Sequence, residues 1–292
     1  MKKTPVQQQA KQKARQQGIA LIAVLWLVSA LGIMVMGMMY AMRGETRMAS
    51  QIQRATLDTG IADAAIRLTL HQLQQANAKA FKAVQSFPIE VFGRSAQVDV
   101  IPLNGFISLN DAPPPLLAAA LQFGAGVSPE VALPLANAID LERKKPTPKG
   151  TPNKFQSVED LLRIPGITYA IFAQIQDLFT VDINNSPLVN PLAASPRVLA
   201  VLGGGDSAKA EQVVAARVGK GEGADTTGLQ FVQNNATSYV LLKATLQNSD
   251  NRPLVRVWRV DLQAKAYGLP WRMLGADAPV HFGEPPIQPK PL

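Results

Sequence analysis

The residues that could do catalytic or metal-binding chemistry are few in this chain, and their spacing does not favour either. Two histidines, His71 and His281, lie far apart in the sequence with no neighbouring base or nucleophile, and there is no cysteine. Neither a Ser-His-Asp triad nor a two-histidine zinc site is expected from such a set. The absence of cysteine excludes disulfides and thiolate metal sites, and it fits the cytoplasm as well as an oxidising periplasm. We therefore predict that the protein is not an enzyme.

The net charge of +8 comes mostly from the N-terminal end of the chain. Five cations and no acid precede Gly18, and the rest of the chain carries only +3. The five are Lys2, Lys3, Lys11, Lys13 and Arg15. A basic leader of this kind is typical of the cytoplasmic flank of a membrane segment rather than of a nucleic-acid-binding surface.

The leader is followed by 25 residues without a charge, from Gly18 to Met42. As a helix this run would be roughly 37 Å long, enough to cross a hydrocarbon core of about 30 Å with some tilt. Three kinds of segment fit it: a cleaved secretory signal, an ordinary membrane anchor, or a helix that is first an anchor and later a packing element. The run is too long for the apolar part of a secretory signal and has no cleavage site at its end, which disfavours the first.

The apolar pattern continues at helical spacing beyond this run, as far as Leu73. No proline or turn cluster interrupts it before Pro88. We predict one long helix that is apolar all round in its first half and amphipathic in its second half, where it packs against a globular domain. Glu45, Asp58 and Asp63 are assigned to the solvent-facing side of this helix.

After Pro88 the pattern predicts strands, then a helical block of about a hundred residues, then strands again. The predicted strands are the segments 96–103, 105–110, 228–233, 238–247 and 254–265. The block contains helices at 116–123 and 131–145 and two helical hairpins at 155–179 and 189–221. Ser157 and Asp160 match a capping box at the start of the first hairpin.

These elements predict an α+β fold, with a long N-terminal helix packed on a small antiparallel sheet and a large all-α domain inserted between strands. The expected parts are a leader at 1–18, a transmembrane or filament helix at 19–42, an amphipathic helix with the first strands at 43–111, the inserted domain at 112–223, the remaining strands at 224–275, and a proline-rich flexible tail at 276–292.

The leader, Gly18, the apolar helix and its amphipathic continuation resemble the type IV pilin and pseudopilin class. The resemblance implies a pilin-like fold and cleavage by a prepilin peptidase between Gly18 and Ile19, with methylation of Ile19. Members of the class carry Glu at the fifth mature position, where this chain has Ala23. That Glu can pair with the amine of the subunit above, so its absence suits a subunit at a filament tip. Together with the stretches FQSVEDLLRIPGIT and VNPLAASPRVLAVL, this combination resembles the minor pseudopilin K family of the type II secretion system (general secretion pathway protein K).

The resemblance implies a function and a place. The protein would be a minor pseudopilin at the tip of the pseudopilus, where it primes assembly of the filament and supports protein export across the outer membrane. Its expected partners are minor pseudopilins I and J, the prepilin peptidase and the inner-membrane secretion platform, with the secretin or an exported substrate as further partners. The precursor would be a single-pass inner-membrane protein with a cytoplasmic N-terminus and a periplasmic body, and the mature form would lie in the periplasmic pseudopilus. A tip minor pilin of a type IV pilus is an alternative that shares this design.

Asp140 and Glu142 are the candidates for calcium, because they lie where relatives carry an acid-rich stretch associated with that ion. Here the stretch reads AIDLERKK, so that Arg143, Lys144 and Lys145 follow at once. Calcium takes six to eight oxygen ligands. We interpret the segment as a solvated helix end and expect no cofactor, with Asp140 and Glu142 kept as the candidate ligands if calcium binds.

The remaining alternative is a periplasmic DNA-binding or DNA-uptake component. The two predicted hairpins resemble helix-hairpin-helix units, in which backbone N–H groups at a Gly-rich turn hold phosphates beside basic side chains. The first hairpin has Thr168 where a second turn glycine is needed, and no cation between Ile164 and Val181. In the second, only Lys209, Arg217 and Lys220 cluster, whereas nonspecific DNA affinity needs several phosphate contacts. We therefore expect no nucleic-acid partner.

Overall fold

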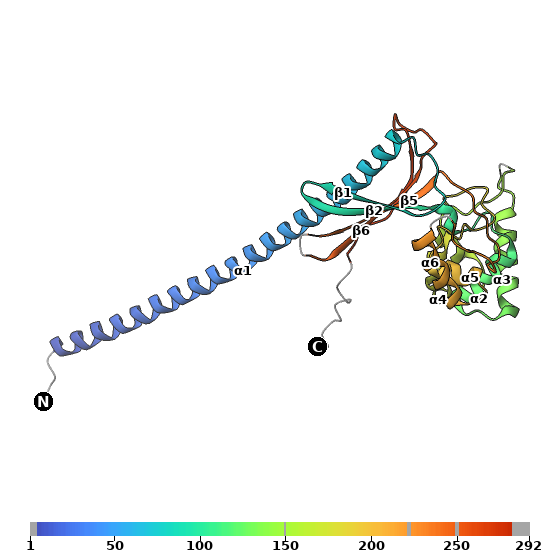
Figure 1. The fold of residues 1–292 in the computed structure, drawn as a ribbon. Coiled ribbons are helices and arrows are strands. Elements are labelled where there is room, and N and C mark those ends of the chain that lie inside the picture. Colours follow the sequence, from blue (N-terminus) through green and yellow to red (C-terminus); the bar gives the residue numbers. More distant parts are fainter. Residues whose placement is uncertain (1–4, 149, 221–222, 249–250, 282–292) are drawn as a thin grey trace. The chain divides into compact units, whose positions relative to one another are not determined.

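The computed structural model describes residues 5–148, 150–220, 223–248 and 251–281, without the side chains of 5–22, 40–47, 218–220 and 281. Its helices and antiparallel strands form a mixed α+β fold, which confirms the predicted fold class (Figure 1). The chain divides into two compact units, Met1–Leu57 and Asp58–Leu292. All the strands that the structure describes lie in the second unit.

One helix, α1 (Pro5–Gln75), holds the leader, the apolar run and its continuation. The predicted long helix is therefore confirmed. It ends where Asn77 takes a left-handed backbone conformation with φ 53°, and the Ala78 N–H donates to the carbonyl of Leu73. The apolar side chains that it buries lie on one face of the helix, at spacings of one, three or four residues. They are Ala62, Ala65, Ile66, Leu70 and Leu73.

The buried face of α1 packs on a sheet of six strands with the order β1–β2–β5–β6–β7, in which β8 also pairs with β6. All of these pairings are antiparallel. Buried and partly exposed residues alternate along β5, as expected for a sheet with one face in the core. The strands are β1 (Gln85–Val91), β2 (Arg94–Pro102), β5 (Tyr239–Gln247), β6 (Pro253–Asp261), β7 (Arg272–Ala276) and β8 (Val280–His281).

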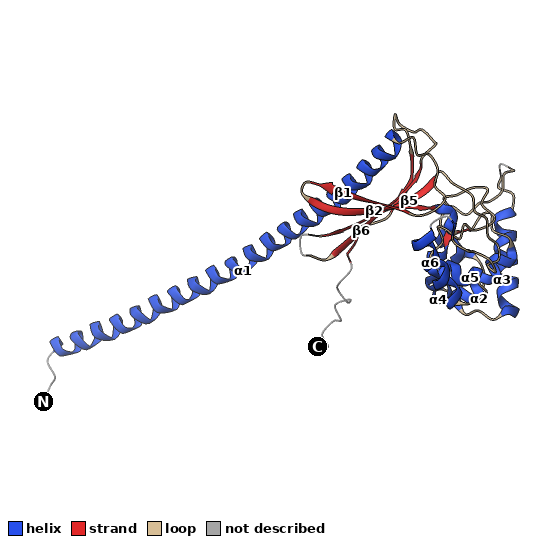
Figure 2. Cartoon of the chain, in the orientation of Figure 1, coloured by secondary structure: helices blue, strands red, loops and turns tan. Residues whose placement is uncertain are grey.

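A helical body is inserted between β2 and β5, and Figure 2 shows its helices gathered together. We call this body, residues 103–238, the insert. It has a core of its own, separate from the core between α1 and the sheet. Its helices are α2 (Pro114–Ala125), α3 (Pro129–Lys144), α4 (Tyr169–Ile175), α5 (Pro196–Leu202) and α6 (Ser207–Lys220), with 3-10 turns η1 (Leu103–Gly105), η2 (Val158–Arg163) and η3 (Gln176–Leu178). Its strands are β3 (Ile107–Ser108) and β4 (Phe179–Thr180), which pair in parallel.

Serine caps mark the start of two helices in the insert. Ser157 and Asp160 form the capping box, and the Asp160 carboxylate accepts from the Ser157 N–H at 3.2 Å. At the start of α5, the Ser195 hydroxyl accepts from the Val198 N–H at 3.2 Å, with Pro196 at the first helical position. Close packing joins η1 to the chain before α5, since a Cβ on Gly105 would lie 2.5 Å from the carbonyl carbon of Ala193.

Some predicted elements were wrong. Strand β1 was not predicted, and the segment 228–233 forms only an isolated bridge between Val189 and Val232. The segment 105–110 contributes just Ile107–Ser108, which pairs with β4 outside the main sheet. The first arm of the first hairpin is the 3-10 helix η2. The expected tail includes the end of β7 and all of β8, and residues 282–292 lie outside what the structure describes.

Candidate functional site

The first candidate site is the apolar part of α1. Gly18 and Ile19, the predicted processing residues, lie within the helix, and their side chains are outside what the structure describes. From Ala23 to Met39 every side chain is exposed, and the large apolar ones from Val24 onward are 50–75 % accessible. In the described residues, no helix is both long enough and apolar enough to span a membrane. The predicted transmembrane segment at 19–42 therefore stays a prediction.

The junction of α1 with the sheet is held by two carboxylates, which corrects their assignment to solvent. Asp58 is only 2 % exposed and pairs with Arg94 of β2 at 2.5 Å. Asp63 Oδ1 accepts hydrogen bonds from Arg256 Nε at 2.7 Å and Trp258 Nε1 at 3.0 Å, both on β6. The guanidinium of Arg67, one helical turn further, lies 5.5 Å from the centre of a Trp258 ring. These contacts fix how the helix lies on the sheet.

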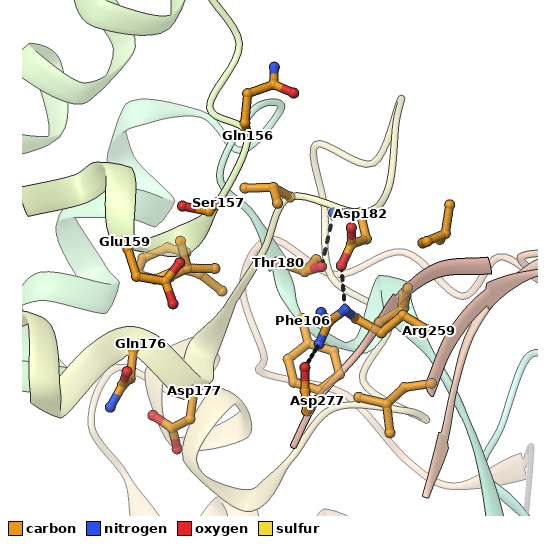
Figure 3. A pocket seen from close by; sticks show the side chains of 16 residues that line it. Phe106, Gln156, Ser157, Glu159, Gln176, Asp177, Thr180, Asp182, Arg259 and Asp277 are labelled. Atoms are coloured by element: carbon orange, nitrogen blue, oxygen red, sulfur yellow. Dashed lines mark hydrogen bonds and ion pairs between the residues drawn. The ribbon is translucent and has the colours of Figure 1, made fainter. Parts of the chain in front are cut away.

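A polar hollow of about 610 Å³ lies between the insert and the sheet (Figure 3). Arg259 of β6 crosses this seam: its Nε lies 2.7 Å from Asp182 of the insert, and its Nη1 donates to Asp277 at 2.6 Å. The contact with Asp182 lacks hydrogen-bond geometry and is an ion pair only. Arg259 therefore links the insert to the sheet through its ion pair with Asp182. The side chains from the insert that line it include Gln156, Ser157, Glu159, Gln176 and Asp177.

The calcium candidates both engage cations. Asp140 accepts from Arg143 Nη2 at 2.6 Å and Lys144 Nζ at 2.7 Å, and Glu142 pairs with Lys145. Partial burial would raise the pKa of Asp140, but the hydrogen bonds from Lys144 and Arg143 outweigh it and lower the pKa below its usual value. Among the described residues, no group of three histidine or acidic side chains could hold a metal ion.

Arg143 has a second role that the sequence did not indicate. Its side chain is buried and donates from Nη1 to the carbonyl of Leu109 at 2.9 Å and from Nη2 to that of Ala112 at 2.7 Å. These bonds tie the end of α3 to the chain that precedes α2. The run of cations after Asp140 is therefore partly structural and not a solvated helix end throughout.

Two of the three cations weighed as DNA contacts make hydrogen bonds inside the insert. Arg217 Nη1 donates to the carbonyls of Leu192 at 3.1 Å and Ala194 at 2.9 Å, and burial lowers the pKa of this guanidinium. Lys209 Nζ donates to the carbonyl of Gly228 at 3.3 Å. The side chain of Lys220 lies outside what the structure describes. Two of the three cations thus hold loops of the insert in place.

Two exposed aromatic residues occupy turn positions that sequence reasoning missed. Phe92 and Gly93 form a two-residue hairpin between Val91 and Arg94, with φ of 50° and 74°. Tyr267 is followed by Gly268 in a second turn of the same kind, with φ of 51° and 76°. Left-handed backbone at both central positions is the type I′ turn, in which Asn-Gly is the usual pair. An aromatic-Gly pair after alternating residues is the signal that could have located them.

Neither a family model nor a curated protein sequence matches the chain. Among solved structures, the chain is similar to the crystal structure of the GspK-GspI-GspJ complex from the type 2 secretion system of enterotoxigenic Escherichia coli. The TM-score is 0.49 at 11 % sequence identity, over 80 % of this chain and 98 % of the matched chain.

Proposed function

We propose that the chain is a non-enzymatic minor pseudopilin of the K kind in a type II secretion system. It assembles with minor pseudopilins I and J through parallel N-terminal helices and forms the tip of a short periplasmic filament. Its role is to prime filament assembly and so support export across the outer membrane. The prepilin peptidase and the inner-membrane platform act on it before assembly, and the secretin or an exported substrate contacts it afterwards.

The observation that carries the proposal is the exposed apolar surface of α1. In the described part of this segment, twelve large apolar side chains between Val24 and Met39 are all exposed, and they are distributed around the helix. A helix that is apolar all round must be covered either by lipid or by other helices. The same helix packs its later residues, from Ala62 to Leu73, on the antiparallel sheet. A long apolar helix that ends on a small sheet is the design of a pilin-class subunit.

The place at the filament tip is supported by Ala23 and by the insert. Ala23 is exposed and has no carboxylate to offer to the amine of a subunit above. An ionised Glu at this position of an apolar bundle costs several kcal/mol unless it is paired, so the subunit without an upper neighbour gains by lacking it. The insert between β2 and β5 adds a folded helical body to the sheet, which gives the tip subunit a surface for partners.

The proposed location follows from charge and hydropathy in the sequence. The precursor would be anchored in the inner membrane by residues 19–42, with the basic leader in the cytoplasm and the body in the periplasm. The five cations before Gly18 and the charge-free run of 25 residues support this orientation. Cleavage after Gly18 would then release Ile19 as the methylated N-terminus of the filament subunit.

Co-purification tests the proposal. The full chain, carrying an affinity tag at its C-terminus, is co-expressed with minor pseudopilins I and J from the same genome and extracted in mild detergent. We expect both partners to remain bound through affinity and size-exclusion steps. A matched variant that lacks residues 1–42 should lose much of this binding, since the parallel helices supply a large part of the contact. A full chain that elutes without either partner contradicts the proposal.

A further inference from the structure

A second hollow, of about 440 Å³, lies where the insert meets the end of β2 and the chain before β1. Its volume falls within the range of about 300–1,000 Å³ that is usual for small-molecule sites. Most of the side chains that line it are apolar, among them Val84 before β1, Ile101 on β2 and Val214 on α6. Val84 is 41 % exposed, so part of this apolar wall faces solvent.

Arg217 on α6 is the only charged side chain among the described residues that line this hollow. Its Nη1 donates to the carbonyls of Leu192 and Ala194, which holds the guanidinium at the wall. Within the described part of the chain, its Nε and Nη2 have no hydrogen-bond partner, and no carboxylate pairs with it. Burial lowers the pKa of Arg217, as expected for a cation that loses hydration without gaining a counter-ion. The hollow therefore offers two N–H donors and one positive charge to an anion.

The backbone along one wall uses most of its polar groups within the chain. The N–H groups of Ala193 and Ala194 donate to the carbonyl of Asn190 at 3.2 and 3.1 Å, and the Leu192 N–H donates to Asn190 Oδ1 at 3.0 Å. The carbonyls of Leu192 and Ala194 accept from Arg217. A peptide would find few partners here for its own N–H and C=O groups, which are costly to bury without hydrogen bonds. The hollow suits a ligand with one anionic group and an otherwise apolar body.

We infer that the hollow binds a medium-chain fatty acid, with its carboxylate on Nε and Nη2 of Arg217 and its hydrocarbon chain against Val84, Ile101 and Val214. The two N–H groups on one side of a guanidinium match the two oxygens of a carboxylate. Each CH₂ group that enters the hollow should strengthen binding by roughly three- to fourfold. This inference does not depend on the proposed function, because every residue that it uses lies in the second compact unit.

Photo-crosslinking to the full chain tests the inference, since it reports where a ligand binds. The probe is a decanoate analogue with a diazirine in its hydrocarbon chain, added to the protein in mild detergent, and labelled peptides are identified by mass spectrometry. We expect saturable labelling of peptides that contain Val84, the segment 192–195 or Val214, and displacement of the probe by excess decanoate. Decanol has the same length without the charge and should need at least a roughly tenfold higher concentration. Labelling of the exposed apolar part of α1 should not saturate and serves as the internal reference.

Three variants separate the site from a structural effect. Arg217→Met removes the charge and should reduce labelling of the hollow about tenfold, but it also removes the bonds to Leu192 and Ala194. Val84→Trp fills the hollow from a partly exposed position and leaves those bonds intact. It should reduce labelling as much while shifting the melting temperature by less than about 2 °C. Lys209→Met is the matched control, because it removes another cation of α6, which donates to the carbonyl of Gly228, and should leave labelling unchanged.

Saturable labelling of the hollow that is lost in Val84→Trp and retained in Lys209→Met supports the inference, and this comparison decides even where Arg217→Met does not fold. Labelling of these peptides that does not saturate, or that Val84→Trp leaves unchanged, overturns it. Equal displacement by decanol and decanoate overturns it as well, because Arg217 would then not be recognising a charge. A peptide with a C-terminal leucine that displaces the probe better than decanoate would show that the site takes a protein C-terminus, and the fatty acid would be the wrong ligand.

Discussion

The carboxylate of Asp63 on α1 accepts a hydrogen bond from the Nε of Arg256 on β6 at 2.7 Å, across 193 positions of sequence. The same oxygen accepts from the indole N–H of Trp258 at 3.0 Å. One acid thus receives two donors from neighbouring positions of a single strand. Since both donor side chains are largely buried, this acid determines where the helix lies along β6.

Replacing Asp63 should therefore destabilise the junction between helix and sheet. Asp63→Ala leaves the Arg256 guanidinium and the Trp258 N–H without their acceptor, and we expect a loss of about 2 kcal/mol and a melting temperature lower by roughly 4–8 °C. Asp177→Ala is the matched control, because it removes an exposed ion pair with Arg197 and should cost less than about 0.5 kcal/mol. Thermal unfolding followed by circular dichroism measures both. If Asp63→Ala lost as little stability as Asp177→Ala, the junction would be held by apolar packing alone.

Substitution by alanine should change the free energy of unfolding in opposite directions at two glycines, Gly60 and Gly105. Gly60 lies within α1 with nothing within 4 Å of an added Cβ, so Gly60→Ala should stabilise the helix by about 0.5–1 kcal/mol. At Gly105, an added Cβ would lie 2.5 Å from the backbone of Ala193, which cannot move without shifting the chain before α5. Gly105→Ala should cost about 3 kcal/mol. Denaturant unfolding of the two variants checks the signs, and a stable Gly105→Ala chain would contradict the close contact.

Lowering the pH should remove the stabilisation that Asp140 contributes to the folded chain. The hydrogen bonds from Lys144 and Arg143 lower its pKa in the folded chain below the ordinary value of about 3.9. The stabilisation is therefore present above about pH 4 and is lost as the pH falls through the lower folded value. Asp140→Asn should reduce the melting temperature at pH 7, and its difference from wild type should shrink as the pH falls below about 4. Glu142→Gln, which touches the more exposed pair with Lys145, serves as the control and should have a smaller effect.

Much of the fold could be predicted because its signals are local. The helical period continues without a proline from the apolar run to Leu73, and the alternation in β2 and β5 is regular. The capping residues Ser157 and Ser195 act within three positions of themselves. Such features depend on neighbours in sequence, which is why the helices and the central strands fell where the patterns indicated.

The failures concern partners that are distant in sequence. Pro88 marked the start of the strand region in the sequence, yet it lies inside β1, because an edge strand tolerates a residue without an N–H. Asp58 and Asp63 look solvent-facing until β2 and β6 bring Arg94 and Arg256 to them. The charged pattern of a helix cannot distinguish water from a cation supplied by a strand far along the chain.

Replacing Gly18 should block the processing step that converts the precursor into the filament subunit. We expect the wild-type chain in cells with an active prepilin peptidase to begin at Ile19 with a methylated amine. Gly18→Ala should block cleavage and leave the precursor, which retains its basic leader and does not support secretion. Intact-mass spectrometry of the purified chains measures the N-terminus directly. A wild-type chain that still begins at Met1 under these conditions would refute the proposed processing.

Introducing the carboxylate that the pilin class uses should not help this subunit. Ala23→Glu adds a charge to a helix whose described side chains from 23 to 39 are uncharged and exposed for contact with other helices or lipid. In the proposed tip position no subunit above supplies an amine, so that carboxylate would be buried without a partner, at a cost of several kcal/mol. We expect secretion to be unchanged or reduced, and the complex with minor pseudopilins I and J to be no more stable. Ala23→Gln, which adds similar bulk without the charge, separates the effect of size from that of charge. If Ala23→Glu instead lengthened the filaments or tightened the complex, an amine would have to lie above Ala23, and the subunit could not be at the tip.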